Sequence, residues 1–324
     1  MVWLEFVLCS FLMIFFAYHL CKEGIILSQK AHLEEGLIGM FFLALATSFP
    51  EVATGSSAVF FLGKIGLGYG DIMGSVIVNT MVLLFLDYFK GKGRILSGTS
   101  LINRLTGIFV VVLLLVVLSS AALRHMKYHI FAYRGIGLES FLIALLYIGS
   151  LEIIRRTNRG GEEEIYKTRE PFIRIWSKFL LLLLIVTLLS FWLAKTGEKI
   201  AETTNLSQTF TGALFLGLAT SFPEMIVSFT ALRAGSVQMA VGNIVGSNLF
   251  DVFILPILDG LTRSPILGML TTGQIAVTGL VTVLAVATVL SLFWKKKTSS
   301  RINWDTGILF AIGFLGFVLL YFIR

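Results

Sequence analysis

Charged residues are scarce in this sequence, whereas long apolar runs are abundant. Only 14% of the 324 residues are Asp, Glu, Lys or Arg, and the mean hydropathy is +0.89. A water-soluble protein of this length carries more charge and shorter apolar runs. Membrane β-barrel strands alternate apolar and polar residues, which these unbroken runs do not do. The composition therefore excludes a soluble protein and predicts an all-α polytopic membrane protein.

Cysteine and N-terminal basic residues are also nearly absent. Cys9 and Cys21 fall in one apolar segment, where we expect them to pack against neighbouring helices. No redox compartment can be inferred from them. The opening MVWLEF has no basic n-region and contains Glu5, so no cleavable signal peptide is expected.

Apolar segments of about 20 residues, long enough to cross a bilayer as helices, recur along the whole chain. Ten transmembrane helices are predicted, near residues 2–19, 34–62, 71–89, 101–123, 133–154, 174–195, 208–232, 238–260, 268–294 and 303–323.

The basic residues that give the net charge of +7 are unevenly distributed between the predicted loops. If the N-terminus is outside, 18 of the 26 Lys and Arg residues fall in inner loops, as the positive-inside rule expects. We therefore expect an integral protein of the plasma (inner) membrane with both termini outside. Its basic loops would meet anionic lipid of the bilayer. No nucleic acid is expected as a partner, and no protein partner is implied.

One heptad, LATSFPE, occurs at 45–51 and again at 218–224. A second pair of segments matches at similar spacing, because YGDIMGSVIVN at 69–79 aligns with VGNIVGSNLFD at 241–251. The chain is therefore predicted to be a duplicated unit.

The predicted units are a first repeat, 1–154, and a second repeat, 174–324, joined by a cytoplasmic linker loop at 155–173. Each unit holds five crossings, so the second enters the membrane inverted relative to the first. Two inverted five-helix repeats around a midplane site are the architecture of many secondary transporters.

The heptad places polar atoms inside an apolar helix. Thr47 and Ser48 lie four and three positions before Glu51, so their oxygens share one helix face. Pro50 should bend the helix and free a backbone carbonyl, although Ser48 and Ser221 could equally bond to their own helices. The second copy repeats the pattern with Thr220, Ser221, Pro223 and Glu224.

A polar stripe runs along the second pair of segments. Asp71, Ser75 and Asn79 are spaced four apart, and Asn243, Ser247 and Asp251 match them. Asp71 allows two interpretations: it belongs to the stripe, or it is a solvated acid at the helix start, favoured by the helix dipole.

No Lys, Arg or His lies inside the four motif segments. A charged carboxylate at the bilayer centre costs about 2.5–3.5 kcal/mol, so mobile cations are the natural counter-ions. Oxygen ligands with carboxylates suit Ca²⁺ and the similarly sized Na⁺ better than Mg²⁺, which demands tight octahedral geometry. These ions are expected as substrates, and no cofactor is expected.

The paired motifs resemble the two alpha-repeats of the calcium/cation antiporter superfamily, most closely its prokaryotic-type sodium/calcium exchangers. That branch typically has G-T-S-x-P-E and G-N-x-x-G-S-N, where this sequence has LATSFPE twice, GDIMGSV at 70–76 and GNIVGSN at 242–248.

The resemblance implies a secondary active antiporter that exchanges Ca²⁺ for Na⁺ by alternating access. It implies that Glu51 and Glu224 are the central cation ligands. The further ligands it implies are the hydroxyls of Thr47, Thr220, Ser75 and Ser247, the backbone carbonyls of Ala44 and Gly217, and the polar pair Asn79 and Asp251.

Departures from the family pattern keep alternatives open. Asp71 and Val76 stand where asparagines are usual, which leaves the ion preference open. Proton-coupled relatives have a glutamate where Gly74 and Gly246 stand, which disfavours Ca²⁺/H⁺ exchange. Ca²⁺/H⁺ antiport, a K⁺-dependent variant and a cation channel remain the alternatives.

An enzyme is not expected. GYGD at 68–71 matches the G-x-G-D of intramembrane aspartyl proteases, but the Y-D and P-A-L strings that such enzymes also need do not occur.

Overall fold

In the part of the chain that it describes, the computed structural model is helical apart from one short hairpin. It describes residues 2–30, 48–90, 95–96, 99–128, 130–133, 135–157, 170–233, 235, 237–262, 265–294 and 304–322. In chain order its elements are α1 (Val2–Lys30), α3 (Phe49–Ser56), the π-helix η1 (Ser57–Phe61), α4 (Ile65–Lys90), α5 (Leu101–His125), β1 (Ala132–Tyr133), β2 (Ile136–Gly137), α6 (Leu138–Thr157), α7 (Phe172–Thr204), α8 (Gln208–Thr211), the π-helix η2 (Gly212–Leu216), α9 (Gly217–Thr220), α10 (Phe222–Arg233), α11 (Val237–Leu261), the 3₁₀ helix η3 (Ile266–Gly268), α12 (Thr272–Phe293) and α13 (Trp304–Phe322).

Several of these helices can cross a membrane. Among the described residues, seven are long and apolar enough, and the bent pair Gln208–Thr220 and Phe222–Arg233 makes an eighth when counted as one span. The predicted segment 34–62 falls partly outside the described residues, and α6 carries four charged side chains. An all-helical membrane protein is therefore confirmed, whereas the count of ten spans stays a prediction.

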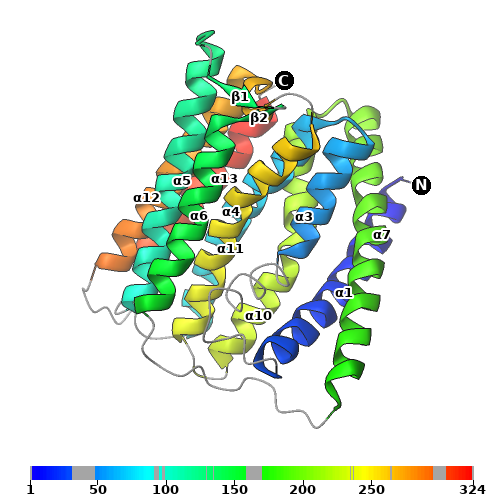
Figure 1. Ribbon diagram of the computed structural model, residues 1–324, viewed down its shortest axis with the longest axis vertical. Helices are drawn as coiled ribbons and strands as arrows, with labels where there is room; N and C mark the ends of the chain where they lie inside the picture. Colours follow the sequence, from blue (N-terminus) through cyan, green and yellow to red (C-terminus); the bar gives the residue numbers. More distant parts are fainter. Residues whose placement is uncertain are drawn as a thin grey trace.

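α4 and α11 form the centre of the molecule. Figure 1 shows them between a group made of α5, α6, α12 and α13 and a flank where α1 lies alongside α7. In the apolar stretches of α4 and α11, 72% and 67% of residues are buried, against 24% in α1 and 33% in α7. The two helices that carry the polar stripes are thus the most enclosed, and both chain ends lie toward the upper end of the view in Figure 1.

The helix that carries the second heptad is broken at Ser221. Its two parts, Gln208–Thr220 and Phe222–Arg233, meet at an angle of 41°. Pro223 explains the break, because it has no N–H and its ring clashes with the carbonyl four residues back. The bend predicted for the second copy is confirmed, whereas the residues before Ser48 in the first copy lie outside the described residues.

Glycines let α4 approach the broken helix backbone to backbone. A Cβ added at Gly70 would overlap the Thr209 carbonyl, and one at Gly74 would overlap the Ala213 carbonyl. Small residues support this kind of close packing in membranes, where dispersion contacts and hydrogen bonds replace the hydrophobic effect. The polar stripe of α4 is thereby held against the helix that carries Thr220.

Asp87 and Asp259 lie near helix ends and are buried, with exposed fractions of 0% and 1%. Asp87 accepts hydrogen bonds from the Ile95 amide at 2.7 Å and from Thr306 Oγ1, on α13, at 2.9 Å. Asp259 accepts three hydrogen bonds, from the Gly137 amide at 2.8 Å, Ser140 Oγ at 2.9 Å and the Ile266 amide at 2.5 Å. Each aspartate therefore ties the end of a central helix to a loop and to a neighbouring helix.

Some helix boundaries differ from the prediction. α1 and α7 extend to Lys30 and Thr204, well past the predicted ends at 19 and 195, because hydropathy marks the apolar part of a helix and not its end. α7 stops at Asn205, whose left-handed φ of 55° closes the last turn. The predicted segment 133–154 begins with the β1–β2 hairpin instead, where Gly135 has a φ of 89°.

Candidate functional site

Four buried carboxylates, each on a different helix, lie in the centre of the bundle. Glu51 on α3, Asp71 on α4, Glu224 on α10 and Asp251 on α11 are all fully buried. Glu51 lies close enough to each of the other three to interact with it electrostatically. Within the described part of the chain, no ion pair involves any of the four. Their charge is therefore not balanced by the basic side chains of this part.

Hydrogen bonds link motif residues of the two copies across the centre. Ser48 Oγ donates to Glu224 Oε1 at 3.1 Å. Asn79 Nδ2 donates to Asp251 Oδ2 at 3.3 Å. In both pairs a neutral donor from the first copy contacts a carboxylate of the second, so the predicted residues of the two copies lie in one cluster.

Thr220 lies at the meeting point of α4 and the broken helix. Its hydroxyl is 3.4 Å from Ser75 Oγ and donates to Asp71 Oδ1 at 3.3 Å. The same hydroxyl also lies 3.1 Å from the Leu216 carbonyl of its own helix. Together with Ser221, it faces the carboxylate of Glu51.

Many oxygens of this cluster have no hydrogen-bond partner among the described residues. The atoms are Glu51 Oε1 and Oε2, Asp71 Oδ2, Asn79 Oδ1, Ser221 Oγ, Glu224 Oε2, Ser247 Oγ and Asp251 Oδ1. A buried polar group left without a partner costs about 1–3 kcal/mol, and a charged group costs more. A cation among these oxygens would offset that cost.

The carboxylates alone do not form a chelating group. Among the described residues, no three His, Cys, Asp or Glu side chains converge closely enough to hold a metal ion. A cation in this cluster would therefore take many of its ligands from hydroxyl, amide and carbonyl oxygens. Such a mixed set of hard oxygen donors is the kind that Ca²⁺ and similar cations accept.

Two predicted ligand positions fall outside the part of the chain that the structure describes, and a third has its carbonyl hydrogen-bonded within its own helix. Ala44 and Thr47 lie outside the described residues. The Gly217 carbonyl accepts from the Ser221 amide at 3.1 Å and lies 3.4 Å from Thr220 Oγ1, so it is hydrogen-bonded inside its own helix.

Two residues outside the predicted set belong to the same buried region. The interpretation of Asp71 as an acid at the helix start is wrong, because α4 begins six residues earlier, at Ile65, and Asp71 is fully buried. Asn248 donates to Thr80 Oγ1 at 3.3 Å, and its Oδ1 has no partner among the described residues. The position of Asn248 in the GNIVGSN motif could have marked it as a candidate site residue.

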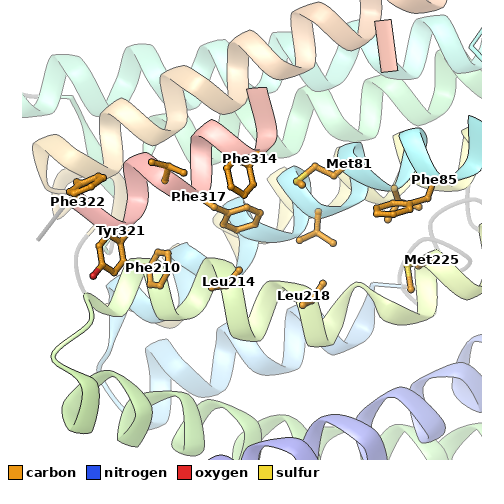
Figure 2. A pocket seen from close by; sticks show the side chains of 13 residues that line it. Met81, Phe85, Phe210, Leu214, Leu218, Met225, Phe314, Phe317, Tyr321 and Phe322 are labelled. Carbon is orange, nitrogen blue, oxygen red and sulfur yellow. The ribbon is translucent and has the colours of Figure 1, made fainter. Parts of the chain in front are cut away.

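A large apolar groove among the described residues is a separate feature. Figure 2 shows Phe, Leu and Met side chains of α4, the broken helix and α13 pointing into it. Its volume is about 610 Å³, and Tyr321 is its one lining residue with a polar side-chain group. An ion would find almost no ligands there, so the carboxylate cluster and not the groove is the candidate site.

Ionisable residues buried within membrane helices mark ion pathways and proton relays. A central carboxylate cluster in a helical membrane protein therefore defines the class as an ion-transport protein. The chain belongs to the sodium/calcium exchanger protein family, whose model matches residues 1–152 and 175–323. The resemblance seen in the repeated motifs is thereby confirmed, and the protein is a cation transporter and not an enzyme.

Individual relatives agree with this assignment. The chain is 24% identical over 256 residues to the inner membrane protein YrbG of Escherichia coli, covering 75% of this chain and 74% of the relative. The crystal structure of the H⁺/Ca²⁺ exchanger CAX matches with a TM-score of 0.68 at 13% identity, covering 99% of this chain and 86% of that one. The sodium-calcium exchanger NCX_Mj matches with a TM-score of 0.56 at 22% identity, covering 97% and 98%. The two structures establish the fold that this chain shares with both exchangers.

Proposed function

We propose that the protein is a secondary antiporter that exchanges Ca²⁺ for Na⁺ across a cell membrane. The observation that carries the proposal is the cluster of four buried carboxylates drawn from both copies of the motifs. Burying several carboxylates without a fixed counter-charge is unfavourable in a membrane. A transported cation supplies the missing charge.

In this proposal Glu51 and Glu224 are the shared core of a single cation site. Thr47, Thr220, Ser48, Ser221, Ser75 and Ser247 supply hydroxyl oxygens, Asn79 and Asp251 supply the polar pair, and Ala44 and Gly217 supply backbone carbonyls. Ca²⁺ and Na⁺ compete because both bind the same kind of oxygen.

Competition at one site leads to alternating access. An occupied site is neutralised in part, so the surrounding helices can close over it. An empty site keeps its mutually repelling carboxylates, and enclosing them away from water on both sides is costly. The protein therefore switches between its inward-open and outward-open states only with an ion bound. The outward movement of one ion is thereby coupled to the inward movement of the other.

One structural observation favours Na⁺ over H⁺ as the coupling ion. The proton-coupled pattern has a glutamate at the positions of Gly74 and Gly246. An added Cβ at Gly74 would overlap the Ala213 carbonyl, whereas one at Gly246 would meet no described atom within 4 Å, so close packing excludes the glutamate in the first copy alone. The structural likeness to CAX and to NCX_Mj concerns the fold alone, so it does not decide between the two coupling ions. We retain Ca²⁺/H⁺ exchange as the alternative.

We further propose ten spans in two inverted repeats, 1–154 and 174–324, with the linker 155–173 on the cytoplasmic side and both termini outside. The excess of basic residues in the corresponding inner loops supports this orientation. The two chain ends lie toward the same end of the molecule, as an even number of spans requires (Figure 1). The relative YrbG is named an inner membrane protein, which favours the same location here.

Flux of ⁴⁵Ca²⁺ into proteoliposomes tests the exchange. Vesicles loaded with Na⁺ are diluted into Na⁺-free buffer, and parallel samples receive a pH gradient or a K⁺ gradient instead. Uptake that requires the outward Na⁺ gradient is the expected result. Uptake driven by the pH gradient alone would move the protein to Ca²⁺/H⁺ exchange, and uptake under none of the gradients would reject Ca²⁺ as the substrate.

A further inference from the structure

The two copies of the motifs differ at a pair of matching positions. Asp71 on α4 corresponds to Asn243 on α11, and Gly55 on α3 corresponds to Ser228 on α10. The first copy thus has a carboxylate and a missing side chain where the second copy has an amide and a hydroxyl.

In the second copy these residues make a local link. Asn243 Nδ2 donates to the Glu224 backbone carbonyl at 3.1 Å and to Ser228 Oγ at 2.9 Å. The link ties α11 to the helix turn that carries the central glutamate. It needs an amide donor on one helix and a hydroxyl acceptor on the other.

The first copy cannot form the same link. An ionised Asp71 has no proton to donate to the backbone carbonyl of Glu51, and Gly55 has no hydroxyl to accept a bond. Both residues of the asparagine–serine pair are replaced in the first copy. Asp71 therefore does not link its helix to the turn of the central glutamate, as Asn243 does in the second copy.

Asp71 instead faces the carboxylate cluster. Its Oδ1 accepts from Thr220 Oγ1 at 3.3 Å, whereas its Oδ2 is buried and has no partner among the described residues. It interacts electrostatically with Glu51 and with Asp251. A fully buried carboxylate with one long hydrogen bond and two like-charged neighbours destabilises the protein on its own.

We propose that Asp71 is a specificity-determining ligand of the transported cation, with Oδ2 as the binding atom. The proposal rests on the Ca²⁺ transport proposed above and adds a residue to that site. A fourth carboxylate raises the affinity of the site for a divalent cation more than for a monovalent one, because the electrostatic attraction scales with the charge of the cation.

The test compares the wild-type protein with Asp71→Asn and with the double variant Asp71→Asn/Gly55→Ser, by calorimetric titration of Ca²⁺ and of Na⁺ in detergent. The double variant restores the asparagine–serine pair of the second copy. A Cβ at Gly55 would come no closer than 3.7 Å to Leu258, so there is room for the Cβ of the serine. Asp259→Asn removes a buried carboxylate outside the cluster and is the matched control.

Both Asp71 variants are expected to bind Ca²⁺ about tenfold more weakly or worse, with Na⁺ affinity changed by less than about threefold. Their melting temperature without Ca²⁺ should stay level or rise, because a buried charge is removed. The control should keep the Ca²⁺ affinity of the wild type.

Unchanged Ca²⁺ affinity in both variants, or a lower melting temperature in both with no selective loss of Ca²⁺, would give Asp71 a structural role and overturn this inference alone. Wild-type protein that binds no Ca²⁺ would instead overturn the proposed function, and the inference with it.

Discussion

Ser48 Oγ donates a 3.1 Å hydrogen bond to Glu224 Oε1, and the two residues are 176 positions apart. Each belongs to one copy of the LATSFPE heptad, and both are fully buried. The bond therefore connects the two copies through the residues that the sequence repeats. It also means that a change in one copy should alter ion binding by a carboxylate of the other.

Replacement of Ser48 tests that dependence. Ser48→Ala removes a donor to a buried carboxylate, and such charge-assisted bonds contribute about 1.5–3 kcal/mol. We expect the Ca²⁺ concentration for half-maximal uptake to change by about tenfold or more. Ser119→Ala, which loses only hydrogen bonds to carbonyls of its own helix, at 2.7 Å to Leu115 and 3.2 Å to Val116, should transport like the wild type. Equal behaviour of the two variants would show that the bond to Glu224 has no role in binding.

The close crossing of α4 with the broken helix makes a prediction about Gly74. An alanine there would overlap the Ala213 carbonyl, and overpacking of this kind costs about 1–3 kcal/mol. Gly74→Ala should therefore lower the melting temperature and the transport rate together. The control is Gly149→Ala, because a Cβ at Gly149 meets no described atom within 4 Å. A Gly74→Ala protein with wild-type melting temperature would contradict the packing described here.

Asp259 should be an anchor for two loops. Asp259→Ala leaves the amides of Gly137 and Ile266 without their acceptor, and each unpaired buried donor costs about 1–3 kcal/mol. We expect a lower melting temperature and faster hydrogen exchange at these two amides. Glu202→Ala, at an exposed ion pair 3.9 Å from Lys64, should change stability by less than about 1 kcal/mol. Unchanged exchange at both amides would reject the anchor.

The proposed orientation can be tested with single cysteines. In a protein with Cys9 and Cys21 replaced, Tyr128→Cys should react with a membrane-impermeant maleimide from outside, since Tyr128 is exposed beside the β1–β2 hairpin. Glu164→Cys, in the linker, should react only from inside. The opposite labelling pattern would reverse the orientation, and labelling of both from one side would contradict an odd number of spans between the two positions.

The sequence predicted the polar residues of the centre better than it predicted the ends of the helices. Glu51 and Glu224 could be found because a carboxylate beside proline and threonine, repeated inside apolar runs, has few structural explanations. Hydropathy could not place the end of α7, because a helix continues through charged residues once it has left the apolar layer.

Contacts between different helices of the bundle could not be predicted from the sequence. Spacing places Asp71 on a polar stripe, but only the folded chain shows that it faces Thr220 and not its own helix start. The overlap that excludes a side chain at Gly74 depends on a backbone more than 130 positions away, at Ala213. Such contacts depend on how two helices cross, which no local pattern encodes.

Equilibrium binding of ⁴⁵Ca²⁺ to purified Glu51→Gln and Glu224→Gln proteins tests the central claim, that the two copies share one cation site. Each glutamine keeps the size of the side chain, and an unchanged melting temperature would confirm that the variants fold. If the site is shared, either substitution alone abolishes measurable binding. If either variant retained about half of the wild-type binding stoichiometry, the two copies would hold separate sites and the account would be wrong.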